Sequence, residues 1–475
     1  MSAPPLRTSR DAESNDAQPA SPGVGGSESG SPRPAAGSVR EGGGACVREL
    51  GGGARIVTAS VGDHPLVLQL LMQAHQAPLA EDFQSRLDEP GYRPSHRLLL
   101  QRDKRLLGHV HVANHIAWFE GQRIPVVILK DFTVLPEYHD SDYEADLLAA
   151  AESIAAAEGA VLALVRTDRN DWFERRGWIA WRGQGHTRAN ARTALAHLDP
   201  QEAPRRRRRT GVEVRLWRHF ELDAIQELYA VAAAALWGPV YRSEACWQWL
   251  IGRKAQDQIL VAVQQGKHQK PPGHDAAPKA VGYAIVRGSA IIELMSLPHS
   301  SPARVQLLAA ACRDAIDRGH NSIALYSPAS DSLHELLVTA GGAWISDRLT
   351  RSPRWMVRLL APQRWVERCY ELWRQRAHLA SVARPFEFGI ADESGVYRFA
   401  LTRRSARLER TTSLPADSIA CARSVLDQLL IGDLAVARAV AEGRLHVSPA
   451  GLQSPLAAVF APRLFWQSSL ELLRL

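Results

Sequence analysis

The sequence predicts an α/β (α+β) protein with two tandem mixed sheets flanked by helices, followed by a smaller α+β domain. The chain has 475 residues and is 45% hydrophobic, which is too long for one core at about 150 residues per domain. One order of strands and helices occurs twice, and a different pattern begins after Pro362. We therefore expect three globular domains.

The first 53 residues have the composition of a disordered tail. They are rich in Ser, Pro, Gly and Ala, and glycine runs occupy 42–44 and 51–53. Such a segment buries too little apolar surface to offset the entropy of ordering. We expect residues 1–53 to lack stable structure.

The first domain is predicted over residues 54–200. A strand ends near Ala59, and the helix after it places Leu66, Leu70, Leu71 and His75 on one face. The remaining predicted elements are strands over 96–102, 105–119 and 123–135, an Ala-rich helix over 143–157, a strand over 161–165, and a short helix that ends at Gly177. Gly159 supplies the left-handed residue that ends the long helix.

The second domain, over 211–361, repeats this order after an Arg-rich linker at 201–210. Arg55 and Asp63 correspond to Arg215 and Asp223 at the same spacing. The run 147–151 and Gly159 correspond in the same way to 307–311 and Gly319, and Pro298 takes the place of Pro136. The pattern predicts a tandem duplication.

The third domain is predicted over 362–475. It begins with a helix containing Trp365, Tyr370 and Trp373, continues with a hairpin over 386–404, and ends with short helices from Ser418 onward. The segment 459–466 is apolar although it lies close to the end of the chain. An end of this composition is expected to be docked.

Composition limits the function classes. The net charge is +7, of which Arg205 to Arg209 supply five, so the rest is nearly balanced. That run lacks interleaved aromatic residues and is interpreted as a solvated linker, so nucleic-acid binding is disfavoured. No run of 18 apolar residues and no signal peptide are evident, which predicts a cytoplasmic protein without a membrane partner. Five dispersed cysteines indicate reduced thiols, and no metal site is predicted.

Several motifs carry a resemblance to a known family. They are DFTVLPEYHD, LLAAAESIAAAEG and WFERRGW in the first copy, IELMSLP in the second, and LDQLLIGDL, AEGRLHV and LAAVFAPRLFW near the end. In this order the chain resembles the enhanced intracellular survival family, from about residue 55 to 475. The resemblance implies two tandem GNAT N-acetyltransferase folds and a sterol-carrier-protein-like domain. It also implies acetyl transfer from acetyl-CoA to an amine, with the first copy active and the second degenerate.

The same resemblance places the cofactor at one strand end and the turn after it. The implied cofactor-binding positions are Phe132, Thr133, Val134, His139, Asp140, Asp142, Tyr143 and Glu144. A diphosphate cradle needs glycine backbone and positive field, whereas this turn is acidic and has no glycine. A carboxylate about 4 Å from a phosphate costs on the order of 4 kcal/mol at an effective dielectric near 20. The residues 140–146 are better explained as acidic caps of a helix, whose positive N-terminal dipole favours carboxylates.

Catalytic positions are predicted in part from the resemblance. The resemblance implies a tyrosine as general acid, and Phe173, which has no proton to give, occupies that position. It also implies the carboxylate of the chain terminus as general base, which here belongs to Leu475. Asp131 and Glu293, each on a strand leading into a turn, are alternative bases, although such carboxylates are more often hydrogen-bond anchors. Arg166 is either a ligand contact or an ion-pair partner.

Two further groups of residues attract attention. His109, His111 and His115 alternate along one strand, and residues two apart are about 7 Å apart, which is wide for metal ligands. We interpret them as solvent-facing or cleft-lining. Three tryptophans, Trp237, Trp247 and Trp249, are expected to pack at a domain interface rather than to line a ligand cavity.

These observations leave two classes of function open. One is an acetyl-CoA-dependent N-acetyltransferase with a degraded cofactor loop and an unknown amine substrate. The other is a non-catalytic GNAT-fold binding or scaffold protein whose acidic loop attracts a basic protein partner. Assembly into a homo-oligomer is compatible with both.

Overall fold

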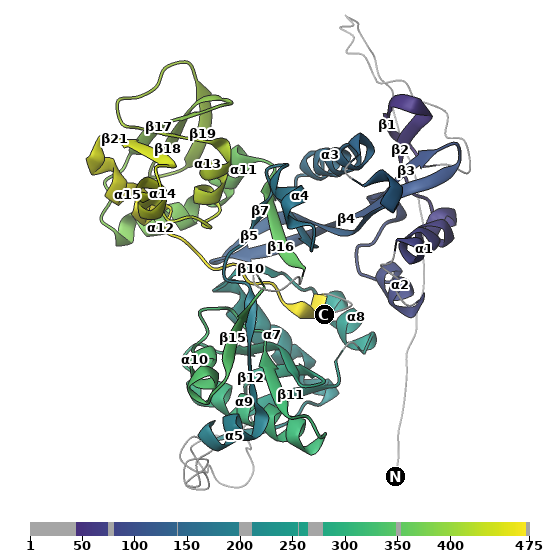
Figure 1. Ribbon diagram of the computed structural model, residues 1–475. Helices are drawn as coiled ribbons and strands as arrows, with labels where there is room; N and C mark the ends of the chain where they lie inside the picture. Colours follow the sequence, from purple (N-terminus) through teal and green to yellow (C-terminus); the bar gives the residue numbers. More distant parts are fainter. Residues whose placement is uncertain are drawn as a thin grey trace, which may run out of the picture. The chain divides into compact units, whose positions relative to one another are not determined.

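The structure is a computed structural model, and it describes residues 44–74, 80–139, 141–198, 211–254, 256–264, 279–347 and 353–471. Figure 1 gives its helices and strands. Asp140, the run Arg205 to Arg209, and Leu475 lie outside the described residues. So does most of the predicted tail.

The first sheet has nine strands in the order β1-β2-β3-β4-β5-β6-β16-β7, and β10 pairs with β4. Its strands are β1 (Cys46–Glu49), β2 (Ala54–Thr58), β3 (Arg97–Arg102), β4 (Arg105–Phe119), β5 (Gln122–Val134), β6 (Leu162–Thr167), β7 (Ile179–Ala180), β10 (Trp237–Val240) and β16 (Arg354–Leu359). Four helices accompany it: α1 (His64–Gln73), α2 (Ala80–Leu87), α3 (Asp142–Ala157) and α4 (Asn170–Glu174).

The predicted strand order of the first domain is confirmed within a few residues, and the predicted range 105–119 is that of β4. The predicted tail is wrong at its end, because residues 46–49 form β1. That strand runs antiparallel to β2, with Arg48 opposite Ile56. Pairing with β2 at the edge of the sheet orders this segment, although glycine runs flank it at 42–44 and 51–53 in the sequence.

The second sheet has the order β15-β8-β14-β13-β12-β11-β9. Its strands are β8 (Gly185–Asn190), β9 (Val212–Leu216), β11 (Gln258–Gln264), β12 (Lys279–Arg287), β13 (Ala290–Ser296), β14 (Ser322–Leu325) and β15 (Ala343–Ser346). Its helices are α5 (Ala191–Leu198), α7 (Leu222–Ala234), α8 (Glu244–Gly252), α9 (Ser301–Asp317) and α10 (Ser332–Thr339).

The two sheets exchange strands across the predicted boundary at 201–210. The strand β8 precedes the boundary but pairs with β14 of the second sheet, with Thr187 opposite Leu325. The strand β16 follows the boundary but pairs with β6 of the first sheet, with Met356 opposite Val165. Each sheet is therefore completed by a strand from the other half of the sequence.

The third sheet has the order β19-β18-β17-β20-β21. Its strands are β17 (Phe386–Asp392), β18 (Gly395–Leu401), β19 (Ala406–Thr411), β20 (Ser418–Cys421) and β21 (Leu445–Ser448). Its helices are α11 (Pro362–Arg368), α12 (Tyr370–Leu379), α13 (Arg423–Leu430), α14 (Val436–Ala441) and α15 (Gln453–Val459). The predicted hairpin is confirmed.

Two predictions for this region are wrong in detail. The single helix expected around Trp365 is divided into α11 and α12 at Cys369. Residues 418–421, expected to be helical, form β20, because Ile419 is buried and pairs parallel with Ile390 of β17. An apolar cavity in this layer measures about 10 Å³, close to one water molecule.

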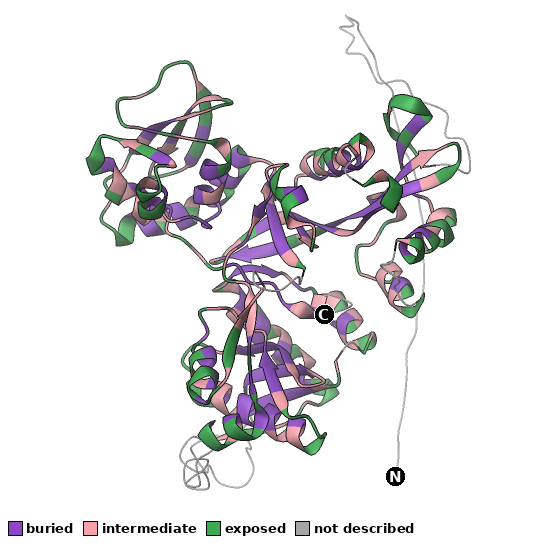
Figure 2. Ribbon diagram, viewed as in Figure 1, coloured by how far each residue is buried: buried purple, intermediate pink, exposed green. Residues whose placement is uncertain are grey.

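Burial follows the strands of all three sheets (Figure 2). The expected docking of the chain's apolar end is confirmed. Phe465 packs with Trp181 and Trp237 in one core cluster, while Trp466 and Leu470 belong to a cluster beneath the second sheet. The backbone N–H of Trp466 donates to the carbonyl of Trp237 at 2.9 Å.

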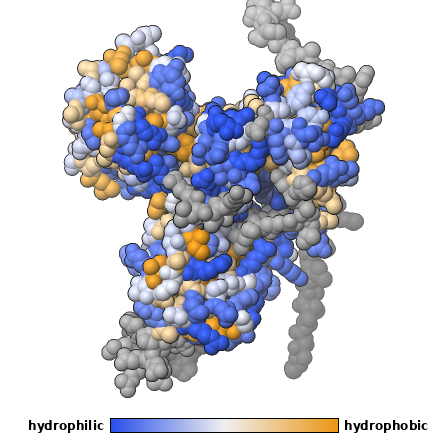
Figure 3. All heavy atoms as spheres, viewed as in Figure 1, coloured by the Kyte–Doolittle hydropathy of each residue, from blue (hydrophilic) through white to orange (hydrophobic). Residues whose placement is uncertain are grey.

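The surface view adds two observations. Hydrophilic residues dominate the face drawn in Figure 3, and apolar residues occur there in small separate patches. Within the described residues, no helix combines the length and the apolar character needed to span a bilayer.

Candidate functional site

The parallel strands β5 and β6 pair side by side and then separate. Their register runs from Val126 opposite Leu162 to Leu129 opposite Val165. A cavity of about 390 Å³, called the cleft below, opens where they part. The charged residues that line it are Arg86, Glu89, Lys130, Asp131, Arg166, Asp168, Arg169 and Glu471.

A bulge in β5 shapes one wall of the cleft. The register of β4 against β5 shifts between His109 and His111, and Asp131 on β5 adopts a left-handed φ of 54°. Its carboxylate forms an ion pair with Arg86 and lies 3.8 Å from Nη1 of Arg97. The structure thus places this candidate base in the cleft wall between two guanidinium groups.

A second carboxylate of the wall is also paired. Lys130 Nζ donates to both oxygens of Glu89, at 2.6 and 2.7 Å. Burial opposes ionisation of Glu89, but the positive charge of Lys130 outweighs it and holds the pKa of this carboxyl below its usual range. Glu89 is therefore a poor proton acceptor.

The end of the described chain supplies a third carboxylate. Glu471 lies in the short 3-10 turn Ser469–Glu471, and its side chain is 8% exposed. Nε of Arg242 donates to its Oε1 at 2.7 Å, while Oε2 has no hydrogen-bond partner among the described residues. Burial and the nearby charge of Glu293 raise the pKa of the Glu471 carboxyl, against the opposing effect of Arg242.

The same arginine holds Glu293, the other sequence-predicted base. Arg242 donates from Nη1 and Nη2 to the two oxygens of Glu293 at 2.8 and 2.7 Å. Tyr283 donates at 2.6 Å, and Ser468 also donates to this carboxylate. Burial opposes the charge of Glu293, but Arg242 and these hydrogen bonds hold its pKa below the usual range. Glu293 is an anchor beneath the cleft and does not line it.

The turn after β5 is where the sequence places the cofactor's diphosphate. Phe132, Thr133 and Val134 end the strand, and the 3-10 turn Pro136–Tyr138 follows. His139 Nε2 lies 3.0 Å from the carbonyl oxygen of Val134. Ser141, the residue before α3, donates its hydroxyl to the carbonyl of Tyr138 at 2.5 Å and caps no amide of the helix.

The acidic residues of this turn do not point in one direction. Asp142 is exposed, and Tyr143 donates its hydroxyl to the carbonyl of Gly51 at 2.9 Å. Glu144 is fully buried and forms an ion pair with Arg169, whose Nη2 donates to Glu144 Oε2 at 3.1 Å. The charge of Glu144 is therefore compensated inside the protein.

Phe173 lies among aromatic rings at the inner end of the cleft. It is buried on α4, and its ring centroid is 5.7 Å from Phe132, 4.9 Å from Trp172 and 5.3 Å from Trp178. A phenyl side chain in this position packs the cleft wall and carries no proton.

Two of the three histidines of β4 contradict the interpretation as solvent-facing or cleft-lining groups, whereas the side chain of His115 is partly exposed. His109 and His111 are buried, since α1 and the loop before β3 cover them. His109 Nε2 lies 3.0 Å from Nη1 of Arg97, and His115 Nε2 lies 3.7 Å from Glu89 Oε1. Within the residues described, no three or more His, Cys, Asp or Glu side chains are grouped to hold a metal.

The remaining predicted residues divide between cleft and core. Arg166 lines the cleft, and burial lowers the pKa of its guanidinium against the opposing charge of Asp347. Trp237 and Trp247 are buried in core clusters, as expected. Trp249 lines the cleft instead, with its Nε1 donating to the carbonyl of Ser85 at 2.8 Å.

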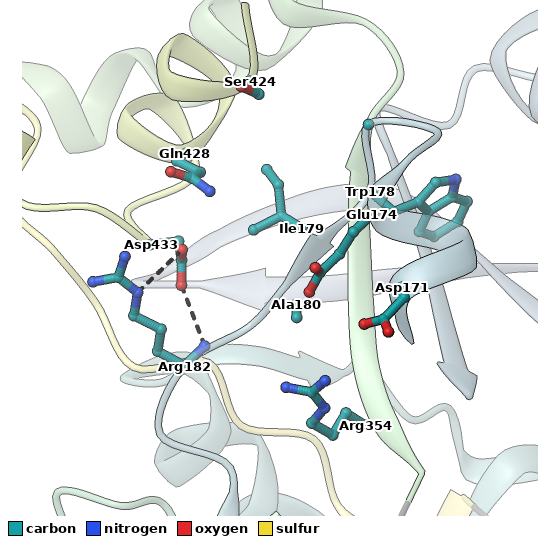
Figure 4. A pocket seen from close by; sticks show the side chains of 11 residues that line it. Asp171, Glu174, Trp178, Ile179, Ala180, Arg182, Arg354, Ser424, Gln428 and Asp433 are labelled. Carbon is teal, nitrogen blue, oxygen red and sulfur yellow. Dashed lines mark hydrogen bonds and ion pairs between the residues drawn. The ribbon is translucent and has the colours of Figure 1, made fainter. Parts of the chain in front are cut away.

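A second cavity, of about 540 Å³, lies between β7 and α13 (Figure 4). On one side Arg182 is joined to Asp433 through its backbone N–H at 3.2 Å. On the other side Asp171 and Glu174 are exposed, and Arg354 lies below them. It is larger than the cleft, but its buried carboxylate, Asp433, is paired with Arg182, so the cleft is the better candidate.

Sequence reasoning did not find Glu471, Arg242 or Arg169. Glu471 stands alone between leucines, and the two arginines carry no motif. The one available signal was the prediction that the chain's end is docked, which makes a carboxylate in that end a candidate.

Comparisons with known proteins agree with this geometry. No protein-family model matches the chain, and no curated protein matches its sequence. Among solved structures, a GCN5-related N-acetyltransferase from Anabaena variabilis has a TM-score of 0.65 at 14% identity, covering 87% of this chain and 99% of its own. A probable N-acyltransferase from Enterococcus faecalis has a TM-score of 0.65 at 13% identity, with the same coverage. The chain therefore has the fold of the GCN5-related N-acetyltransferases.

The fold is also similar to that of Eis1 from Mycobacterium abscessus. Its TM-score is 0.58 at 17% identity, covering 87% of this chain and 98% of that one.

Proposed function

We propose that this protein is an N-acetyltransferase that binds acetyl-CoA in the cleft and transfers its acetyl group to an amine. The observation that carries the proposal is the separation of β5 and β6 beside a cavity with a buried carboxylate at its wall. The fold shared with GCN5-related N-acetyltransferases supports the same function.

The edge of β5 suits an amide-containing arm of the coenzyme. Beyond Leu129, this strand keeps its pairing with β4, as in Lys130 opposite His111, but has no partner in β6. Backbone groups at an unpaired strand edge readily accept a further extended ligand. Phe132, Thr133 and Val134 are the residues that would hold it.

The turn before α3 suits the diphosphate better than its composition indicates. The first amides of α3 have no side-chain cap, and the helix N-terminus favours an anion. The pairing of Glu144 with Arg169 removes one of the negative charges that the sequence placed there. When bound, the coenzyme supplies the acetyl group as a thioester.

The chain's own residues have definable tasks in this scheme. Arg166 and Lys130 place positive charge in the cleft wall, and Trp249 and Trp355 make the wall partly apolar. Phe173 excludes water from the inner end by packing with Phe132 and Trp172. Because Phe173 has no acidic proton, the proton that neutralises the leaving sulfur must come from the amine or from water.

Thermal unfolding with acetyl-CoA tests the proposal. A ligand at 100 times its Kd adds about 2.7 kcal/mol of stability, which shifts Tm measurably. Asp168→Trp fills the cleft wall and is expected to abolish the shift. Asp171→Trp changes an exposed residue of the second cavity and should retain it.

Turnover is measured as release of free thiol in the presence of primary amines, from methylamine to spermidine. The wild type is expected to release thiol only when both acetyl-CoA and an amine are present. A wild type that gives neither a shift nor turnover would instead be a non-catalytic binding protein.

A further inference from the structure

We propose that the side-chain carboxylate of Glu471 is the general base that deprotonates the acceptor amine. This inference rests on the proposed function and adds the residue that makes the amine nucleophilic. It assigns to Glu471 the task that the family resemblance implies for the terminal carboxylate of Leu475.

The first support is position. Glu471 belongs to the last described turn of the chain, yet its side chain lines the cleft beside β5, β6 and Trp249. The turn is fixed by Leu470, which is buried beneath the second sheet, and by Ser468, which donates to Glu293. The burial of Leu470 and the hydrogen bond from Ser468 therefore hold the Glu471 carboxylate in place.

The second support is the unequal use of its two oxygens. Oε1 accepts a hydrogen bond from Arg242 Nε at 2.7 Å, whereas Oε2 has no partner within the described chain. A buried acceptor without a donor costs about 1–3 kcal/mol, so a donor that enters the cleft recovers this cost. An alkylammonium group is such a donor, and its charge complements the carboxylate.

The third support is electrostatic. Arg242 donates both Nη1 and Nη2 to Glu293, so its positive charge is shared between two carboxylates. The titratable and charged groups around Glu471 are Arg242, Arg253, Glu293, Glu89, Cys246 and Tyr229. Burial and the charge of Glu293 raise the pKa of Glu471, which increases its affinity for a proton.

The other carboxylates of the cleft are less suited to this task. Asp131 is paired with Arg86, and Glu89 accepts two hydrogen bonds from Lys130. Asp168 is exposed to solvent. Glu471 combines burial with an oxygen that has no hydrogen-bond partner among the described residues. Asp131 Oδ2 also lacks such a partner, but the Asp131 carboxylate forms ion pairs with both Arg86 and Arg97.

The proposed step balances as follows. Glu471 takes one proton from the ammonium group, which leaves a neutral carboxylic acid and an amine with a free electron pair. The amine nitrogen forms the C–N bond to the acetyl carbon while the C–S bond breaks with its electron pair on sulfur. A second proton from nitrogen neutralises the sulfur, and Glu471 returns its proton to water.

Glu471→Gln tests this role, because the amide oxygen can still accept from Arg242. We expect kcat/KM with the best amine of the series to fall at least 100-fold, the range typical of a lost general base. The Tm shift caused by acetyl-CoA should not change. Glu174→Gln, an exposed glutamate of the second cavity, serves as the matched control.

Two readouts separate a base from a structural residue. Titration calorimetry with the amine alone should give at least tenfold weaker binding to Glu471→Gln than to wild type. The acid limb of the kcat/KM profile should be present in wild type and absent in the variant. If Glu471→Gln does not fold, Glu471→Asp keeps the charge, shortens the side chain by one CH₂, and should lose at least tenfold in kcat/KM.

The outcomes distinguish this inference from the function on which it rests. Full turnover in Glu471→Gln or Glu471→Asp would overturn the role of Glu471 while acetyl transfer stands. Addition of a Gly-Ser tail after Leu475 should leave turnover intact, and a loss of activity there would assign the base to the terminal carboxylate. A wild type without coenzyme shift, turnover and amine binding would overturn both.

Discussion

Arg242 and Glu471 are joined by a 2.7 Å hydrogen bond although they lie in different parts of the sequence. Because Arg242 also holds both oxygens of Glu293, the end of the chain is tied to the middle of the second sheet. The cleft therefore depends on a buried charge cluster that three separate segments build.

Arg242→Met should destabilise the protein strongly. The change leaves Glu293 buried without its cation, and loss of one partner of a buried pair costs about 3–5 kcal/mol. Urea unfolding gives the free energy of unfolding of each variant. Arg398→Met, which breaks an exposed pair with Glu387, should change the free energy of unfolding much less. If both variants lowered the free energy of unfolding by the same amount, the buried charge cluster would contribute no more to stability than an exposed ion pair.

Arg169→Met should weaken acetyl-CoA binding, because it removes a cation that pairs with Glu144 at the N-terminus of α3. The double variant Arg169→Met with Glu144→Gln should recover much of the affinity, since the repulsion is then removed. Calorimetry gives the Kd for acetyl-CoA of the single and the double variant. No recovery in the double variant would mean that Arg169 contacts the coenzyme directly.

Stability should fall as the pH drops below about 6.5. Burial and the charges of Arg97 and Lys130 lower the pKa values of His109, His111 and His115, the last to about 4. A histidine with a lowered folded pKa stabilises the fold above its unfolded pKa, and this stability is lost as pH falls from there. The unfolded chain binds the extra protons, which gives about 1.4 kcal/mol per pH unit for each histidine.

The variant His115→Gln isolates one of these contributions. Its free energy of unfolding is measured beside that of the wild type between pH 8 and pH 4. The difference between the two should be constant above pH 6.5 and should shrink as the pH falls. A difference that does not change with pH would contradict the lowered pKa of His115 in the folded protein.

Gly238→Ala should release the end of the chain. Gly238 has φ 115°, and an added Cβ would lie 2.4 Å from Cε2 of Phe465. Undocking of Phe465 exposes the apolar segment, which limited proteolysis detects as faster cleavage near residue 466. Gly252→Ala, with nothing within 4 Å of the new Cβ, is the control and should be neutral or slightly stabilising.

Phe173→Leu should lower stability without removing a proton donor. Loss of ring contacts with Phe132, Trp172 and Trp178 is expected to cost about 1–3 kcal/mol. Turnover per folded molecule should stay within about threefold at low temperature. A drop in kcat much larger than the change in stability explains would give Phe173 a direct part in catalysis.

Local pattern was sufficient to predict the elements but not all of their neighbours. Strand β4 and helix α3 follow from alternation and from a 3.6-residue period, both of which depend on nearby residues. The exchange of β8 and β16 depends on which edges lie adjacent in space, and periodicity carries no information about that. The boundary predicted at 201–210 was placed on composition alone, so it could not anticipate strands that cross it.

The candidate site was predictable in its place and not in its chemistry. The motif around Asp131 located the strand that borders the cleft. The neutralisation of Glu144 by Arg169, and the position of Glu471, arise from contacts between segments far apart in sequence. The number of acidic residues in the turn before α3 therefore does not determine the electrostatic potential there.

The exchange of β8 and β16 limits how this protein can be divided. A gene fragment that ends at the 201–210 segment would encode a first sheet without β16, and its β8 would have no edge to join. Because each half supplies a strand to the other, the halves should melt in a single transition, and separately expressed pieces should aggregate unless they are produced together.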